Sequence, residues 1–197
     1  MGRVFVVTIL SLFILAGCHT ASKKYVKPYF DFDSLVQAQQ HLLKSSGASV
    51  TKQATVNDRH ETVTFTPDTT QWKNELEIFA QLDVVNKPMY KTAYRINYGL
   101  KDPNSNLIVK EYRATVPSPI PYVLFYYQPD TRQLRKIAGR LEETNALFSS
   151  VRVVTLEFDE LQGHTALEKY TLHGVQKMIM TDSTVVDIEG KINVSSH

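Results

Sequence analysis

Hydrophobic and polar positions follow three different patterns along this chain of 197 residues. An almost unbroken apolar run covers residues 4–15. Between about residues 33 and 87, two segments carry apolar residues three and four positions apart, the spacing that places them on one face of a helix. From residue 92 onward the period changes to that of β-strands. The order of these patterns predicts helices early in the chain and a β-sheet late in the chain.

The first helical pattern spans about residues 33–45. Asp31 or Asp33 can cap its N-terminus by accepting hydrogen bonds from the free backbone amides of the first turn. One face of this predicted amphipathic helix carries the apolar residues Leu35, Ala38 and Leu42. An Asp-x-Asp pair could also belong to a phosphotransfer site, but we favour the cap interpretation.

A β-hairpin and a second helix follow. Residues 48–56 and 59–66 are rich in Thr and Val, which suit strands. The second helix is expected to begin at residue 68 or 69, and Pro88 ends any helix before it. Its apolar face holds Trp72, Leu76 and Phe79.

The remaining chain is predicted to consist of strands separated by turn signals, among them three prolines between residues 117 and 121. The expected strands are residues 92–98, 107–116, 122–127, 132–142, 147–159, 165–173, 175–181 and 184–192. Short strands at regular spacing without helices between them form antiparallel meanders. We therefore predict an α+β fold, mostly an antiparallel meander of about seven to nine strands, with the two amphipathic helices of the N-terminal half packed on the sheet.

The strand at residues 122–127 is apolar on both faces. Such a strand lies at the centre of a sheet or borders a second apolar surface, which is the only indication of a ligand site in the predicted fold. The candidate lining residues are Tyr122, Leu124, Phe125, Tyr126 and Tyr127. Aromatic rings with polar tips suit contact with lipid, glycan or protein. They also suit half-buried strands, which is the interpretation we favour for the tyrosines as a group.

The N-terminal run has the features of a secretory signal. It follows a single positive charge at Arg3, and its dozen or so residues are fewer than the roughly 20 that a membrane-spanning helix needs. It ends at Leu15-Ala16-Gly17-Cys18, which resembles the lipobox of bacterial lipoproteins. The resemblance implies that Cys18, the only cysteine, receives a thioether-linked lipid and becomes the first residue of the mature chain. The N-terminal lipid would then hold the protein at a membrane.

Two other interpretations of this segment stay open. Cys18 could be a buried structural cysteine beside a simple signal, or the segment could be an uncleaved membrane anchor. No acidic residue directly follows Cys18, since the next residues are His19 to Lys24. In similar lipoproteins, acidity at that place often directs retention or surface export. By this analogy we expect an outer-membrane lipoprotein that faces the periplasm.

The length and charge of the chain indicate how many domains it forms and whether it binds nucleic acid. Removing the first 17 of 197 residues leaves 180, which suits one domain. We expect a signal peptide at residues 1–17, a tether at 18–28 and a single α+β domain at 29–197. Of the 22 Lys and Arg residues Arg3 is lost with the signal, so 21 basic residues face 20 acidic ones. This near-neutral balance makes no case for nucleic acid as a partner.

The sequence lacks the familiar catalytic and cofactor motifs. It contains no Gly-x-Gly-x-x-Gly, phosphate loop, His-Glu-x-x-His or Gly-x-Ser-x-Gly, so we expect no enzyme, no cofactor and no metal site. Ser49-Val50-Thr51-Lys52 matches the Ser-x-x-Lys motif of penicillin-binding proteins, but it falls in an expected strand rather than at the start of a helix. The acidic pairs Glu142-Glu143 and Asp159-Glu160 could hydrolyse sugars, yet they fall where turns are expected.

Four features of the sequence can be compared with known families: Tyr29-Phe30-Asp31, residues 72–79, Asp83 with Lys87-Pro88 and Tyr94, and the strand at 188–192. In these features the chain resembles a group of uncharacterised lipoproteins of gram-negative bacteria. These motifs are structural, and the resemblance attaches no activity to them. A helix-covered antiparallel sheet behind a lipobox is also similar, in architecture alone, to the lipoprotein carriers and receptors of the LolA/LolB type, which hold acyl chains in a curved half-barrel.

Three functions follow as expectations. The first is a lipid-anchored, non-enzymatic periplasmic domain that binds an apolar ligand or an envelope protein partner on one face of its sheet. The second is a structural or accessory lipoprotein that acts by protein–protein contact, with an exposed apolar patch and no cavity. The third is a hydrolase of envelope polymers, which would need clustered carboxylates or a Ser/Lys/His set that the spacing hides.

Overall fold

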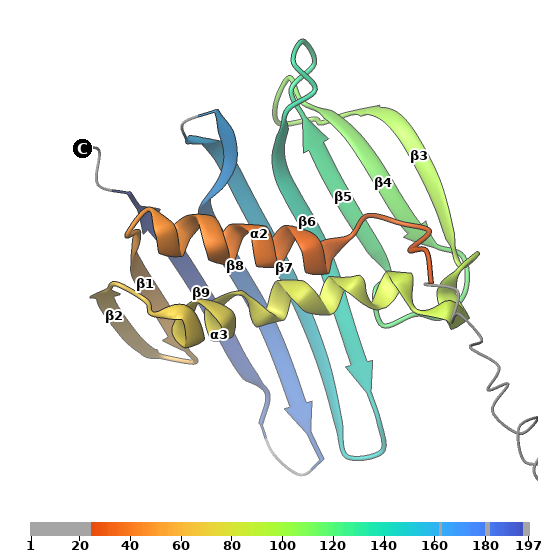
Figure 1. The fold of residues 1–197 in the computed structure, drawn as a ribbon. Helices are drawn as coiled ribbons and strands as arrows, with labels where there is room; N and C mark the ends of the chain where they lie inside the picture. Colours follow the sequence, from red (N-terminus) through yellow and green to blue (C-terminus); the bar gives the residue numbers. More distant parts are fainter. Residues whose placement is uncertain (1–24, 162, 180–181, 195–197) are drawn as a thin grey trace, which may run out of the picture.

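The computed structural model describes residues 25–161, 163–179 and 182–194. These residues form a nine-stranded antiparallel sheet with two α-helices across one of its faces (Figure 1). The strand order is β2-β1-β9-β8-β7-β6-β5-β4-β3. The expected α+β meander, with its helices in the N-terminal half, is therefore confirmed.

The helical elements are α2 (Phe32–Ser45), α3 (Thr69–Ala80) and the 3-10 helices η2 (Gln81–Asn86) and η3 (Pro88–Tyr90). The first hairpin consists of β1 (Ser49–Val56) and β2 (Arg59–Phe65). The later strands are β3 (Tyr94–Lys101), β4 (Ile108–Ala114), β5 (Tyr122–Tyr127), β6 (Leu134–Thr144), β7 (Phe148–Leu161), β8 (His164–Met178) and β9 (Thr184–Asn193).

Strands β3 to β9 follow one another across the sheet as a continuous meander. The β1–β2 hairpin precedes them in the chain but joins the sheet beyond β9. Strand β1 pairs with β9 from Ser49 opposite Asn193 to Val56 opposite Val186. The last strand of the chain therefore lies between the first strand and β8.

Strand β8 corrects one expectation about the meander. The sequence pattern predicted two strands, at residues 165–173 and 175–181, with a break at Gly174. The structure has one continuous strand through Gly174, which pairs with Arg152 on one side and with Val186 on the other. The prediction of a break was wrong because ladders on both sides hold this glycine in extended backbone.

Both helices begin where an aspartate caps them. Asp31 accepts a hydrogen bond from the backbone amide of Ser34 at 3.1 Å, which selects Asp31 from the two candidates for α2. Asp68 and Gln71 form a capping box at α3, in which each side chain accepts a hydrogen bond from the other residue's backbone amide. The predicted start of each helix is confirmed.

The core lies between the two helices and the sheet. The helices contribute the buried residues Phe32, Val36, Leu43, Trp72, Leu76 and Phe79. The sheet contributes buried residues such as Val50, Tyr112, Val123, Phe125, Ile137, Val154, Leu156 and Tyr170. A void of about 10 Å³ remains where α2 and α3 meet β7 and β8. That volume is about what one water molecule needs, so this void has no room for an acyl chain.

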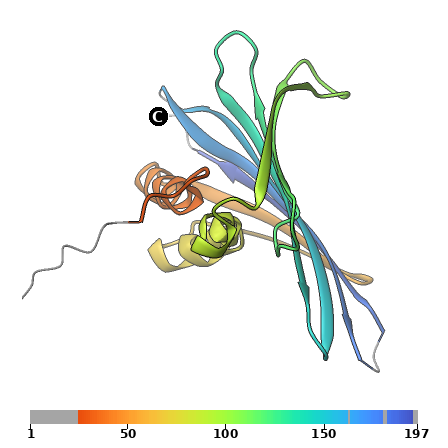
Figure 2. The ribbon, with the colours of Figure 1, turned by 90° about the vertical axis from the view of Figure 1, so that its right-hand side faces the viewer.

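Both helices lie against the same face of the sheet, and the opposite face carries no described helix (Figure 2). We call this uncovered side the open face. Successive side chains of a strand point to opposite faces, so the pairing register assigns each strand residue to the helix face or to the open face.

Candidate functional site

The residues proposed from the sequence for a ligand surface on β5 lie on both sides of the sheet. Tyr122, Leu124 and Tyr126 point to the open face, where each is partly exposed. Phe125 and Tyr127 point to the helix face and pack in or against the core. The structure therefore brings only three of the five candidates to one surface.

Phe125 is a central residue of the core. Its exposed fraction is 0%, and the ring centres of Phe30 and Tyr112 each lie 5.0 Å from its own. Tyr127 is half-buried beside this cluster, and burial raises its pKa. A partner on the surface cannot reach Phe125, so the open-face residues of β5 are the ones that can form a site.

Strands β3, β4 and β6 place further side chains beside these three on the open face. The cross-strand rows are Arg95, Arg113, Tyr122 and Arg140; then Asn97, Glu111, Leu124 and Ala138; then Leu100, Val109, Tyr126 and Lys136. We call these residues the Tyr–Arg patch. Arg95 stands directly opposite Arg113, and like charges in that position destabilise a sheet unless another group offsets them.

Glu111 offsets part of that positive charge. Although it belongs to the open face, it is only 6% exposed, and it accepts hydrogen bonds from Arg113 Nε at 2.9 Å and from Asn97 Nδ2 at 2.8 Å. Burial alone would raise the pKa of Glu111, but these hydrogen bonds and the charge on Arg113 hold it below its ordinary value. The ionised carboxylate fixes the Arg113 guanidinium, whose central carbon lies 5.8 Å from the centre of the Tyr122 ring.

Two more basic side chains are held in place within the patch. Lys136 Nζ lies 4.0 Å from the centre of the Tyr126 ring, a cation–π contact. Arg140 Nε donates a hydrogen bond to Glu142 at 2.6 Å. Burial also raises the pKa of Tyr126, so its hydroxyl stays protonated and able to donate. The patch thus presents aromatic rings and aliphatic side chains together with three basic side chains, those of Arg113, Lys136 and Arg140, that contacts within the protein already hold in place.

The rest of the open face has a different composition. Across β7, β8, β9 and β1, the second and third rows continue with Thr155, Thr171, Glu189 and Gln53, and with Glu157, Lys169, Lys191 and Thr51. Lys169 Nζ lies 2.8 Å from a carboxylate oxygen of Glu189. Short polar side chains and cross-strand ion pairs are typical of a sheet face in contact with water. Beyond these rows the open face of β7 to β9 also carries Val151, Val153, Val175 and Val185. The open face is therefore divided into the Tyr–Arg patch and a second half without tyrosine or arginine, which we call the polar half after these two rows.

A groove of about 730 Å³ lies on the helix face, between η2, residues 117–120 and strands β6 and β7. Its apolar lining includes Val84, Ile120 and Leu141. Arg152 reaches the groove from β7, and its buried Nε has no hydrogen-bond partner among the described residues. The nearest carboxylate oxygen, from Glu143, is 4.0 Å from Nη2 of Arg152. Lys87 adds a second positive charge to the lining, and Glu142 and Glu143 add two carboxylates. The apolar wall beside the unpartnered Nε of Arg152 fits a small amphiphile whose acidic head reaches Arg152 and Lys87.

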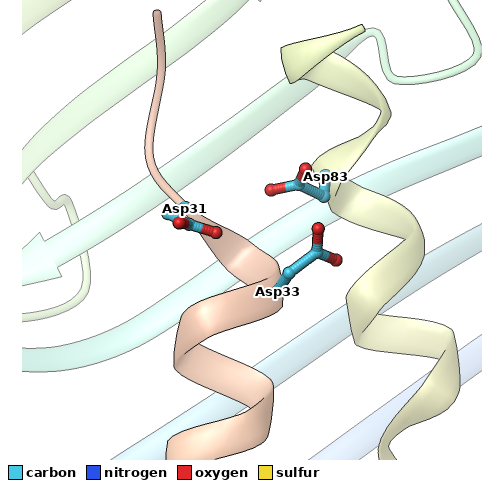
Figure 3. A group of neighbouring side chains, drawn as sticks. All are labelled: Asp31, Asp33 and Asp83. Atoms are coloured by element: carbon cyan, nitrogen blue, oxygen red, sulfur yellow. The ribbon is translucent and has the colours of Figure 1, made fainter. Parts of the chain in front are cut away.

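Three carboxylates meet where α2 begins beside η2 (Figure 3). They belong to Asp31, Asp33 and Asp83, and one oxygen of each lies within 4.8 Å of the others. Lys27 Nζ lies 2.6, 2.8 and 2.8 Å from these three carboxylates. The protein's own ammonium group thus contacts all three carboxylates and offsets part of their negative charge. Its visible role is to tie Lys27, near the start of the described chain, to the beginning of α2 and to η2.

The sequence motifs considered for hydrolysis are not assembled. Ser49 and Lys52 lie on opposite faces of β1, and Lys52 Nζ pairs with Glu75 of α3 at 3.0 Å. The pairs at 142–143 and 159–160 lie in β6 and β7 rather than in turns, so that part of the prediction was wrong. They lie in strands because both ladder partners extend further than the sequence pattern indicated.

Comparison of the chain with models of known protein families, with curated proteins and with solved structures gave no match. The lipobox-like segment and Cys18 lie outside the described residues. Within the described residues, no helix combines the length and the apolar character that crossing a membrane requires. The candidate sites are therefore supported only by the geometry of the described residues.

Hydrophobic patterning along the chain points to β5 but not to the arginines around it. Arg95, Arg113 and Arg140 come from three other strands, and only the pairing register brings them next to Tyr122. A signal was present, because each arginine occupies a polar position in an alternating strand. Alternation gives the face of a residue within its own strand but not its neighbours in the next one.

Proposed function

We propose that this chain is a lipid-anchored, non-enzymatic protein of the bacterial envelope that binds a protein partner through the Tyr–Arg patch. The proposed anchor is a lipid on Cys18, which the lipobox-like residues support. Its proposed place at the outer membrane, facing the periplasm, rests by analogy on the absence of an acidic residue directly after Cys18. The observation that carries the binding role is the difference between the two halves of the open face. Both halves belong to one sheet, but only one presents tyrosine and arginine side chains.

Tyrosine and arginine dominate the centres of protein interfaces. Tyrosine offers a large contact area with few rotatable bonds, and the guanidinium group offers several directed donors. In the patch, Glu111 orders Arg113 and the Tyr126 ring orders Lys136. A partner therefore loses less affinity to the ordering of these side chains. Leu124, in the middle row, supplies an apolar centre to the patch.

Site-specific crosslinking in cells tests this proposal. A photoreactive amino acid in place of Leu124, in the full lipidated chain, should give a discrete product with one partner protein. The same group in place of Thr171, in the polar half, should not. Adding Tyr122→Ser or Arg140→Glu should reduce the Leu124 product about tenfold or more, since hot-spot side chains contribute at least about 2 kcal/mol.

Lys191→Glu is the matched control, because it changes a charge on the same face outside the patch. It should leave the crosslinked product unchanged. Equal products from positions 124 and 171, or none from either, would contradict a partner on the Tyr–Arg patch.

The groove beside Arg152 favours a second candidate, in which the protein carries an apolar ligand with an acidic head. The core between the helices and the sheet leaves a void of only about 10 Å³. The groove is therefore a better place for such a ligand than the interior. Native mass spectrometry of the protein, extracted from a bacterial periplasm without detergent, should then show a bound mass. Arg152→Gln should remove that mass and Lys191→Gln should not. A spectrum without bound mass would exclude this candidate.

A further inference from the structure

Three large apolar side chains project together from one end of the sheet. Leu147, in the turn between β6 and β7, is 69% exposed, while Met178 and Ile179 at the end of β8 are 50% and 57% exposed. The backbone holds them together, because the Ile179 amide donates to the Leu147 carbonyl at 3.0 Å and Phe148 pairs with Met178. We call Leu147, Met178 and Ile179 the apolar tip.

The fold does not require these side chains. The turn is formed by Asn145, whose side-chain oxygen accepts hydrogen bonds from the amides of Leu147 and Phe148 at 2.8 and 3.0 Å. The side chains of the apolar tip are not part of the buried core. Turns are usually polar, and large apolar side chains exposed together mark a surface that meets a membrane or another protein.

The described chain begins at the same end of the sheet. Strands β3, β5, β7 and β9 run in one direction, so all of them start at this end. Tyr29 is fixed there, because its hydroxyl donates to the Lys91 carbonyl at 3.0 Å and its ring lies 5.2 Å from that of Tyr94, the first residue of β3. A lipid anchor would therefore pull this end of the sheet toward the membrane.

The length of the tether matches the reach of the tip. Leu147 lies six residues beyond Val153, which stands in the same cross-strand row as Arg95, so it projects about 20 Å past that row. The seven residue steps from Cys18 to Tyr25 span at most about 25 Å. A chain of that length permits the tip to reach the bilayer surface that holds the lipid.

We infer that the apolar tip inserts into the lipid bilayer beside the anchor and so fixes the orientation of the sheet. This inference rests on the proposed anchor at Cys18. Lys177 and Asp182 line the crevice next to the tip with opposite charges. Their charges nearly cancel, so insertion is driven by burial of apolar surface and depends little on salt or on anionic lipid.

A fluorescent label tests the inference on the full lipidated chain. Cys18 carries the lipid and is the only cysteine, so Leu147→Cys provides a single site for an environment-sensitive dye. The protein is placed in vesicles of phosphatidylethanolamine and phosphatidylglycerol. Nitroxide-labelled lipids should quench the dye at position 147 about threefold or more over a dye at Lys191→Cys, which stands about 23 Å farther along β9 from its first residue.

Each other outcome overturns the inference. Equal quenching at both positions, or stronger quenching at 147 by aqueous iodide, shows a tip in water. A dye at 147 that is shielded from iodide but not reached by lipid nitroxides shows contact with a second copy or another protein. Intact mass and flotation are measured on the same sample, so a chain without lipid identifies failure of the anchor itself. Emission from Trp72, the only tryptophan and a buried one, verifies that each variant is folded.

Discussion

Tyr170 joins a helix and two strands through one ring and one hydroxyl. Its hydroxyl donates to Glu75 of α3, which also accepts a hydrogen bond from Lys52 of β1 at 3.0 Å. Burial and the neighbouring carboxylate raise the pKa of Tyr170. The ring lies over Gly190 of β9, where a Cβ atom would be 2.1 Å from the ring carbon Cζ. Glycine is needed at this position because the ring approaches the backbone closely, not because the chain turns.

Gly190→Ala should therefore lower the free energy of unfolding by about 1–3 kcal/mol, the usual cost of forcing an extra group into a packed core. Urea denaturation followed by Trp72 fluorescence measures it. Gly174→Ala is the control, because its nearest neighbour would be the flexible Arg152 side chain at 3.3 Å. A smaller loss at residue 190 than at 174 would contradict the role given to Tyr170.

Lys27 favours the ionised form of Asp31 at the start of the fold. Its hydrogen bond, with that from the Ser34 amide, lowers the pKa of Asp31 from 3.8 to about 2. The resulting stability is present above pH 3.8 and is lost as the pH falls through about 2. Lys27→Ala should move the pKa of Asp31 back toward 3.8, as measured by NMR titration of the carboxyl carbons. Lys44→Ala, at the other end of α2, should not change it.

At the scale of elements, α3 depends on its capping box. Asp68→Ala removes the acceptor for the Gln71 amide, and loss of an N-cap costs about 1 kcal/mol. Urea denaturation should show that decrease in the free energy of unfolding. Glu77→Ala, at an exposed position in the middle of the same helix, should change it by less than about 0.5 kcal/mol. Equal losses would show that the cap contributes nothing specific.

The sequence predicted the helices and strands more successfully than it predicted which residues lie next to one another across the sheet. Asp31 and Asp68 gave the helix starts because capping is a local property of a few residues. The break predicted at Gly174 was wrong because its conformation is not set locally. The ladders that keep Gly174 extended come from β7 and β9. Tyr122 could be proposed as a surface residue from its own strand. Its arginine neighbours could not, because pairing register depends on the whole sheet.

At the scale of the whole molecule, buried tyrosines should set the limit of stability in alkali. Burial raises the pKa values of Tyr94 and Tyr112 from 10.0 to about 12, and that of Tyr170 also rises. The unfolded chain releases these protons near pH 10 while the folded chain keeps them. The stability they contribute is therefore complete below pH 10 and is lost as the pH rises toward 12.

Urea denaturation at a series of pH values, with the ultraviolet absorbance of tyrosinate as a second signal, measures this loss. Tyr112→Phe removes one of the titrating groups, so its stability should fall less steeply above pH 10 than that of the parent chain. Tyr25→Phe, at an exposed position, is the control and should follow the parent curve. Identical slopes for the three proteins would contradict the assignment.

The position of β9 also determines when this protein can fold. Strand β1 is made among the first residues of the domain, but its sheet partner ends at Asn193. Until β9 is available, the β1–β2 hairpin has no sheet to join, and one edge of β8 has no strand to pair with. Pairings so distant in sequence form slowly, since a long loop must close before they add stability. For a chain exported across a membrane as an extended thread, as the proposed signal would require, folding would therefore be completed only after the last strand had passed through.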